Sequence, residues 1–166
     1  TFTNGVRLGT ANTISAAANY SDLTLTGVGN GEIQGQIGGT SGNPSTVVNM
    51  QIIKSGLGTW TLSGTNTYTL QTTISAGILN IRNSSALGAV LTSETVPSAA
   101  NAGTTVASGA TLQLQNNISV GAEALTLGGT GASGQNGALV NVSGTNSFAG
   151  ALTFTANTAI SSDSGS

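Results

Sequence analysis

The strongest constraint on the fold is an internal repeat. The segment Leu62–Tyr68 (LSGTNTY) is matched by Val142–Phe148 (VSGTNSF) at an offset of 80 residues (142 − 62). The offset continues without insertion, so that Thr73–Ile74 corresponds to Thr153–Phe154. Repetition of this kind indicates stacked structural units that bury a continuous core only by lying on one another.

A second repeat relates two other segments of the chain. Thr72–Gly77 (TTISAG) is similar to Thr104–Gly109 (TTVASG). After one inserted residue, Leu79–Ile81 (LNI) then corresponds to Leu112–Leu114 (LQL). We expect these segments to occupy equivalent places in different units. Asn66 with Asn146, and Thr65 with Thr145, are expected to stack as hydrogen-bonded ladders.

Alternation of apolar residues with Thr or Ser between glycine-rich turns is typical of β-strands with one buried face. This pattern is clearest in the central part of the chain, and no helix has such a period. Loops are expected near 38–46, which contains Asn43-Pro44, and near 92–104. Strands are predicted at Leu23–Gly27, Glu32–Ile37, Val47–Ile52, Thr59–Leu62, Thr72–Ser75, Ile78–Ile81, Leu112–Leu114, Ile118–Val120, Leu125–Gly129, Leu139–Val142 and Leu152–Phe154.

Similar strand units that recur along the chain favour coiling over the antiparallel hairpins of a sandwich. With about 20 residues per coil, the chain predicts an all-β solenoid of roughly eight coils, on the order of 40 Å long. We expect residues 1–166 to form a single segment of this kind. The predicted inward residues are Leu23, Leu25, Trp60, Leu62, Ile74, Leu79, Ile81, Leu112, Leu114, Leu125, Leu127, Val142, Phe148 and Phe154.

Composition argues against several functional classes. Only 5% of the residues are charged and the net charge is −2, which provides no basic surface for nucleic acid. The chain has no Cys and no His, so disulfides, thiolate metal sites and the commonest general base are missing. The five acids are scattered, and Asp22 with Glu32 is interpreted as surface charge. We therefore expect no enzyme activity, no cofactor, no metal site and no transmembrane segment in this chain.

The central motif carries a family resemblance. Gly56–Tyr68 (GLGTWTLSGTNTY), followed by Thr72–Leu79 (TTISAGIL), resembles the passenger-associated β-strand repeat of bacterial autotransporters. The likeness extends over most of residues 23–166. It implies a right-handed parallel β-helix that is exported to the bacterial cell surface or secreted, and that acts as a stalk or an adhesive passenger.

Three functional classes follow. The first is a non-enzymatic structural or adhesive segment that forms a stalk, fibre or filament. The second is a glycan- or ice-binding solenoid with a Thr-rich face, and the third is a polysaccharide-active enzyme, which needs two acids within about 10 Å. The residues expected to define the structural repeat are Gly64, Thr65, Asn66, Tyr68, Gly77, Gly144, Thr145, Asn146 and Phe148. The candidate binding face consists of Thr24, Thr26, Thr59, Thr61, Thr67, Thr69, Thr153 and Thr155.

The ends of a solenoid expose unpaired strand edges unless they are capped. Neither the Thr1 end nor the polar tail Ser161–Ser166 offers an amphipathic helix or a charged lid. We therefore expect the ends to stack on neighbouring coils of a longer solenoid or on copies of the chain in a filament. Surface glycans and the surface of a host or neighbouring cell are the other expected partners.

Overall fold

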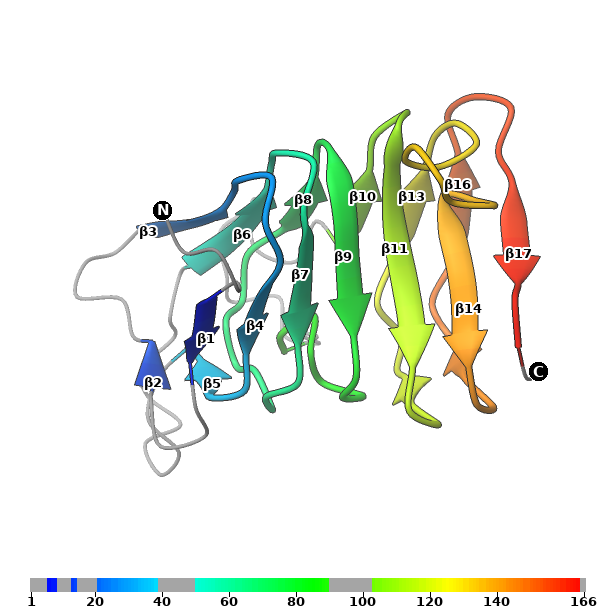
Figure 1. The fold of residues 1–166 in the computed structure, drawn as a ribbon. Helices are drawn as coiled ribbons and strands as arrows, with labels where there is room; N and C mark the ends of the chain where they lie inside the picture. Colours follow the sequence, from blue (N-terminus) through cyan, green and yellow to red (C-terminus); the bar gives the residue numbers. More distant parts are fainter. Residues whose placement is uncertain (1–5, 9–12, 15–20, 39–49, 90–102, 165–166) are drawn as a thin grey trace.

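The chain winds into a parallel β-solenoid. The computed structural model describes residues 6–8, 13–14, 21–38, 50–89 and 103–164, and the structural statements that follow concern these residues. Two long sheets face each other along the solenoid, and successive strands of each are contributed by successive coils (Figure 1). All strand pairs are parallel. The predicted all-β solenoid is therefore confirmed, while its right-handedness stays a prediction.

Each coil passes through three sides. The first is a seven-stranded sheet and the second is a six-stranded sheet, while short two-stranded pairs lie on a third side. The seven-stranded sheet contains, in order, β1 (Val6–Leu8), β4 (Gly31–Ile33), β7 (Thr59–Leu62), β9 (Gly77–Ile81), β11 (Ala110–Gln115), β14 (Leu139–Ser143) and β17 (Ile160–Ser162). The six-stranded sheet contains β3 (Ser21–Leu25), β6 (Met50–Lys54), β8 (Thr72–Ile74), β10 (Thr104–Val106), β13 (Leu125–Leu127) and β16 (Leu152–Phe154). The short pairs are β2 (Thr13–Ile14) with β5 (Gln36–Ile37) and β12 (Ser119–Val120) with β15 (Ser147–Phe148).

The sheet register reproduces the sequence repeats fully in the six-stranded sheet and in part in the seven-stranded sheet. Thr72 of β8 pairs with Thr104 of β10, as the second repeat predicts. In the seven-stranded sheet Leu79 pairs with Leu112 as expected, but Gly77 lies opposite Ala110 and not opposite Gly109, so the inserted residue falls before this pair. The register that starts at Leu62 also ends at Asn141, one residue before its sequence counterpart Val142.

Coil length varies more than a regular repeat would suggest. From Trp60 to its partner Leu79 the chain advances 19 residues (79 − 60), but from Leu79 to Leu112 it advances 33 (112 − 79). The seven-stranded sheet consequently marks seven levels in the described residues, against the roughly eight expected. Most of the loops expected near 38–46 and 92–104 lies outside the described residues, although Thr104 belongs to β10.

One strand prediction was wrong. The segment Glu32–Ile37 is divided between β4 and β5 rather than forming one strand, because the chain turns a corner of the solenoid at Gln34–Gly35. At this corner a Cβ on Gly64 of the next coil would lie 2.2 Å from the Gly35 carbonyl oxygen. The tail expected at Ser161–Ser166 includes Ser161 and Ser162, which belong to β17 and pair with β14.

Aliphatic side chains stacked between the sheets form the core. Of the predicted inward residues, Leu25, Leu62, Ile74, Leu79, Ile81, Leu112, Leu114, Leu125 and Leu127 are buried. Leu23, Trp60 and Phe148 are partly buried and pack against the core, and Val142 is half-buried. Phe154 is the clear error, because its side chain is 57% exposed. It lies on β16, the end strand of its sheet, so no further coil covers it.

Candidate functional site: an amide-lined groove across the coils

The Gly-Thr-Asn repeat is a structural site. Asn66 Oδ1 accepts a hydrogen bond of 2.9 Å from the N–H of Ile37, and Asn146 Oδ1 accepts one of 2.8 Å from the N–H of Ile118. In both copies the residue after the Asn donates its own N–H to the carbonyl of the same isoleucine. The Asn side chain therefore replaces a backbone carbonyl in the parallel pairing of two coils. The expected Asn-on-Asn ladder is not formed by these two residues, because each bonds to the backbone of the preceding coil.

The other residues of the structural repeat lie close to this corner or at the start of a strand. Tyr68 is fully buried, whereas its counterpart Phe148 is partly buried on β15. Gly77 begins β9. The remaining members, Gly64, Thr65, Gly144 and Thr145, lie in the turns that precede the two asparagines.

The eight threonines of the candidate binding face do not share one face. Thr24 and Thr153 lie on β3 and β16 of the six-stranded sheet, and Thr26 and Thr155 directly follow these strands. The other four belong elsewhere. Thr59 and Thr61 lie on β7 of the seven-stranded sheet, and Thr67 and Thr69 lie between β7 and β8.

The six-stranded sheet nevertheless carries a file of threonines on its outer surface. Each member pairs in register with the next, and none belongs to the buried core. From one end of the sheet to the other the file contains Thr24, Ile53, Thr73, Thr105, Thr126 and Thr153. Successive members are about 4.8 Å apart because this is the spacing of neighbouring strands. We call this row the threonine file.

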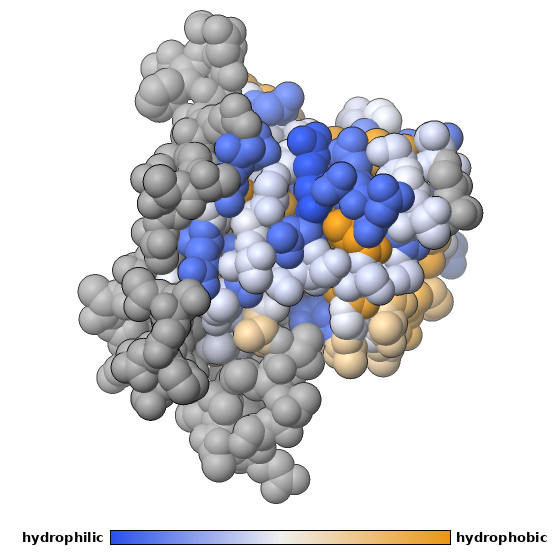
Figure 2. All heavy atoms as spheres, turned by 90° about the horizontal axis from the view of Figure 1, so that it is seen from below, coloured by the Kyte–Doolittle hydropathy of each residue, from blue (hydrophilic) through white to orange (hydrophobic). Residues whose placement is uncertain are grey.

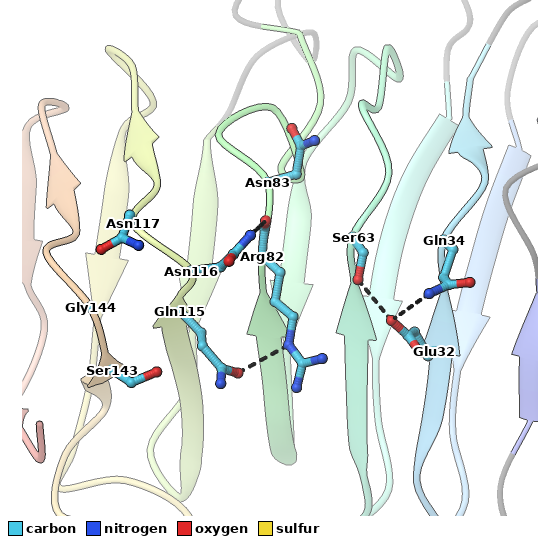
Figure 3. A pocket seen from close by; sticks show the side chains of 10 residues that line it. All are labelled: Glu32, Gln34, Ser63, Arg82, Asn83, Gln115, Asn116, Asn117, Ser143 and Gly144. Carbon is cyan, nitrogen blue, oxygen red and sulfur yellow. Dashed lines mark hydrogen bonds between the residues drawn. The ribbon is translucent and has the colours of Figure 1, made fainter.

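A polar groove lies on the opposite side of the solenoid, beside the seven-stranded sheet. It has a volume of about 680 Å³ and crosses five levels of that sheet. Its side chains come from the ends of β4, β7, β9, β11 and β14 and from the turns that follow them (Figure 3). The lining consists of Glu32, Gln34, Ser63, Arg82, Asn83, Gln115, Asn116, Asn117, Ser143 and Gly144.

Arg82 occupies the middle of the groove and is held in place by amides. Its Nε donates to Asn80 Oδ1 at 3.1 Å and to Gln115 Oε1 at 3.0 Å. Glu32 lies two levels away and accepts hydrogen bonds from Gln34 Nε2 at 3.2 Å and Ser63 Oγ at 2.9 Å (Figure 3). The groove therefore carries one guanidinium and one carboxylate that are separated along the solenoid.

An unusual turn forms one wall of the groove. Asn116 and Asn117 both have positive φ, 83° and 57°, and are the only residues other than Gly with positive φ among those described. Asn tolerates this conformation better than most residues, but two in succession are uncommon. Asn117 Oδ1 accepts from the Thr145 N–H at 2.9 Å, and Asn116 Nδ2 donates to the Arg82 carbonyl at 3.3 Å. These bonds attach the turn to the coils on both sides.

Charged and polar groups are also buried inside the solenoid. Lys54 is completely buried, and its Nζ donates to the carbonyls of Gly56 and Ala76, each at 2.8 Å. Burial lowers the pKa of Lys54 to about 8. These contacts cap two turns of adjacent coils, so the structure gives Lys54 a stabilising position rather than a reactive one.

Glu123 and Tyr68 are two further buried polar residues, and each is hydrogen-bonded to a threonine of the six-stranded sheet. Thr104 Oγ1 donates to Glu123 Oε1 at 3.1 Å, and Tyr68 Oη lies 2.6 Å from Thr72 Oγ1. Burial raises the pKa of Glu123, an effect partly offset by the Thr104 hydrogen bond. Burial also raises the pKa of Tyr68, and the Glu123 charge adds to this effect while the Thr72 hydrogen bond opposes it.

Asp22 and Glu32, the nearest acidic residues in the sequence, are separated in the fold. Asp22 and Glu32 lie on different sheets, and Asp22 accepts a hydrogen bond from Gln51 at 2.7 Å. Three or more potential metal ligands do not cluster anywhere in the described parts of the chain. Among those same residues there is no helix of the length and apolarity needed to cross a membrane.

Comparison with known families gives one match. The passenger-associated-transport-repeat family matches residues 52–81, which contain most of β6 and all of β7, β8 and β9. The chain carries an autotransporter passenger repeat. This passenger repeat is a β-helix unit, and its family consists of secreted or surface-exposed bacterial proteins. No curated protein and no solved structure matches the chain.

The passenger repeat agrees with the geometry of the coils that it covers. It begins in one sheet and ends in the other, so its 30 residues (81 − 52 + 1) include strands of two successive coils. Residues 52–81 thus form a passenger-associated repeat within the parallel β-solenoid. Sequence reasoning identified this repeat but missed the groove, whose residues come from the turn ends of coils of unequal length.

Proposed function

We propose that the segment is a non-enzymatic structural or adhesive part of a bacterial cell-surface or secreted protein, which forms a stalk, fibre or filament by stacking of coils. The observation that supports this most directly is the open C-terminal end of the core. At this end, the rows of buried side chains that run along both sheets finish in apolar side chains that no other described residue covers.

Three apolar side chains mark this open end. Leu152, Phe154 and Ile160 are 43%, 57% and 51% exposed. In the sheets they pair with Leu125, Leu127 and Leu139, all of which are buried. Side chains at equivalent positions are therefore buried in the second-to-last strand of each sheet and exposed in the last strand. Figure 2 shows hydrophobic residues reaching the surface on the side where the C-terminal coils lie.

The end coil also leaves space that another coil can fill. An open hollow of about 410 Å³ lies between the last coils and is lined by four apolar residues, among them Leu139, Phe148 and Ile160, and by four Asn and Ser residues. Ser161 Oγ is buried there without a hydrogen-bond partner. In addition, β16 and β17 end their sheets, so each has one edge unpaired within the described residues. An edge of this kind accepts another strand.

A further coil stacked on this end would bury the exposed apolar side chains and would pair with the open edges of β16 and β17. Full burial of each large apolar side chain contributes about 1.5–3 kcal/mol before the cost of association is subtracted. The added coil belongs either to the same polypeptide or to a second copy of the chain. In both cases the product is a longer rod.

Sedimentation velocity of the isolated segment over a range of concentrations tests the proposal. We expect elongated oligomers that are lost in the double variant Phe154→Asp/Ile160→Asp. Leu57→Asp is the matched control, because Leu57 is 75% exposed but lies in a turn away from the open end. Monomers at all concentrations, or oligomers that persist in the double variant, would count against stacking.

The threonine file favours a second candidate function, binding of ice or a glycan. Its members form a regular outer row of hydroxyl and methyl groups on a sheet with uniform strand spacing. The test is ice-recrystallisation inhibition and glycan binding by the wild type and by Thr126→Lys, a change in the file. Thr130→Lys, in an exposed turn, is the control. Equal activity of both variants would exclude the threonine file as the binding face.

A further inference from the structure

The groove around Arg82 has the properties of a binding site that goes beyond a structural rod. It runs along the solenoid axis over five levels of the seven-stranded sheet, which corresponds to about 19 Å for four strand spacings. Such a groove suits an extended polymer better than a compact small molecule. Because its walls are turns tied to both neighbouring coils, its shape is fixed before a ligand binds.

Arg82 presents an unused hydrogen-bonding fork. Only its Nε is engaged, by Asn80 and Gln115, and neither Nη1 nor Nη2 has a partner among the described residues. The side chain is exposed, and in Figure 3 it runs parallel to its strand, with the guanidinium between Gln115 and Ser63. The two Nη groups of a guanidinium match the two oxygens of a carboxylate, and the fixed Nε reduces the entropy lost on binding.

Neutral donors and acceptors surround this fork. Gln115 Nε2, Asn117 Nδ2 and Ser143 Oγ all belong to lining residues, and none of these atoms has a hydrogen-bond partner elsewhere in the described chain. Amide and hydroxyl groups of this kind exchange hydrogen bonds with the hydroxyls of a sugar. They extend beyond Arg82 toward the C-terminal coils, so a polymer bound by the fork also reaches them.

The charge of the groove restricts the ligand further. Arg82 is the single cation among its lining residues, and the carboxylate of Glu32 lies two levels away. A polyanion such as nucleic acid needs many cationic contacts, and the lining residues of the groove include only one cation. A ligand with widely spaced negative charges and many hydroxyls fits this pattern.

We propose that the groove binds an extended glycan that bears carboxylate groups, with the Nη fork of Arg82 on one carboxylate and the amides of Gln115 and Asn117 on ring hydroxyls. This site is independent of the stacking end. A structural rod without a ligand therefore remains the alternative outcome of the test.

The test compares two probes that share a backbone, a short oligogalacturonate and its methyl ester. Binding is followed by changes in amide chemical shifts of the folded segment. We expect the acid to shift residues of the groove, and we expect Arg82→Gln to weaken its binding about ten- to hundredfold, the effect of losing hydrogen bonds to a charged group. Arg82→Lys retains the charge without the fork and should recover only part of the affinity. The methyl ester should bind as weakly as the acid binds to Arg82→Gln.

Thr130→Ala, in an exposed turn outside both the groove and the threonine file, is the matched control and should bind like the wild type. Equal binding of acid and ester, full affinity in Arg82→Gln, or shifts confined to the six-stranded sheet would each overturn the proposal. Arg82→Gln should also associate end to end like the wild type. Loss of glycan binding is thereby separated from failure of coil stacking.

Discussion

The substitution Asn66→Ala tests how the Gly-Thr-Asn repeat connects the coils. Asn66 is 2% exposed, accepts from the Ile37 N–H at 2.9 Å and donates to the Ala86 carbonyl at 2.6 Å. Alanine removes both bonds and leaves two backbone groups of neighbouring coils unsatisfied. Since such losses cost about 1–2 kcal/mol each, we expect the free energy of unfolding to fall by about 2–4 kcal/mol.

Urea unfolding followed by fluorescence of Trp60, the single tryptophan, measures this change. Thr65→Ala is the control because Thr65 is exposed in the same motif, and it should stay within about 0.5 kcal/mol of the wild type. Amide exchange should become faster at Ile37 in Asn66→Ala. If Asn66→Ala were as stable as the control and Ile37 kept its protection, the bridging role would be refuted.

Three further predictions concern buried charge and turn geometry. Because burial lowers the pKa of Lys54 from 10.5 to about 8, the unfolded chain binds more protons between these values. Unfolding free energy should rise with pH across that window in urea titrations, and Lys54→Met should remove the slope. Because burial raises the pKa of Glu123 above its ordinary 4.5, stability should fall as pH rises from 4.5 to the raised value. Glu123→Gln should flatten this acid dependence and raise the melting temperature at neutral pH; an unchanged profile would mean that Glu123 titrates normally. Gly77 and Gly109 have φ of 66° and 83°, but a Cβ would lie 2.4 Å from the Gly56 carbonyl oxygen only at Gly77. Calorimetry should therefore show a cost of about 1 kcal/mol for Gly109→Ala and about 3 kcal/mol for Gly77→Ala, and equal costs would contradict this difference in contact.

Stacked register was the part of the fold that the sequence predicted best. Thr72–Ile74 and Thr104–Val106 occupy equivalent places because parallel coils put like residues over like, but Gly77 pairs with Ala110 rather than with Gly109, since the inserted residue lies in the preceding turn. Burial was predicted well where coils continue on both sides. It failed at Phe154, since alternation identifies the inward face of a strand but does not reveal that the strand ends the sheet.

The groove was not predictable from the sequence for a physical reason. Arg82 and Gln115 are 33 residues apart (115 − 82) and hydrogen-bond because one coil has that length. Coil lengths depend on loops that the strand pattern does not describe. The corner at Gln34–Gly35 was missed for a similar reason, because an alternating pattern continues through it without a change of period.

The threonine file provides the most direct test of the solenoid itself. Spin labels at Thr24 and Thr153 replace residues at opposite ends of the file, five strand spacings apart in register. Pulsed dipolar spectroscopy should give a narrow backbone-corrected distance of about 24 Å, and labels at Thr24 and Thr126 should give about 19 Å. A broad distribution, or a Thr24–Thr126 distance equal to or longer than the Thr24–Thr153 distance, would contradict successive parallel coils.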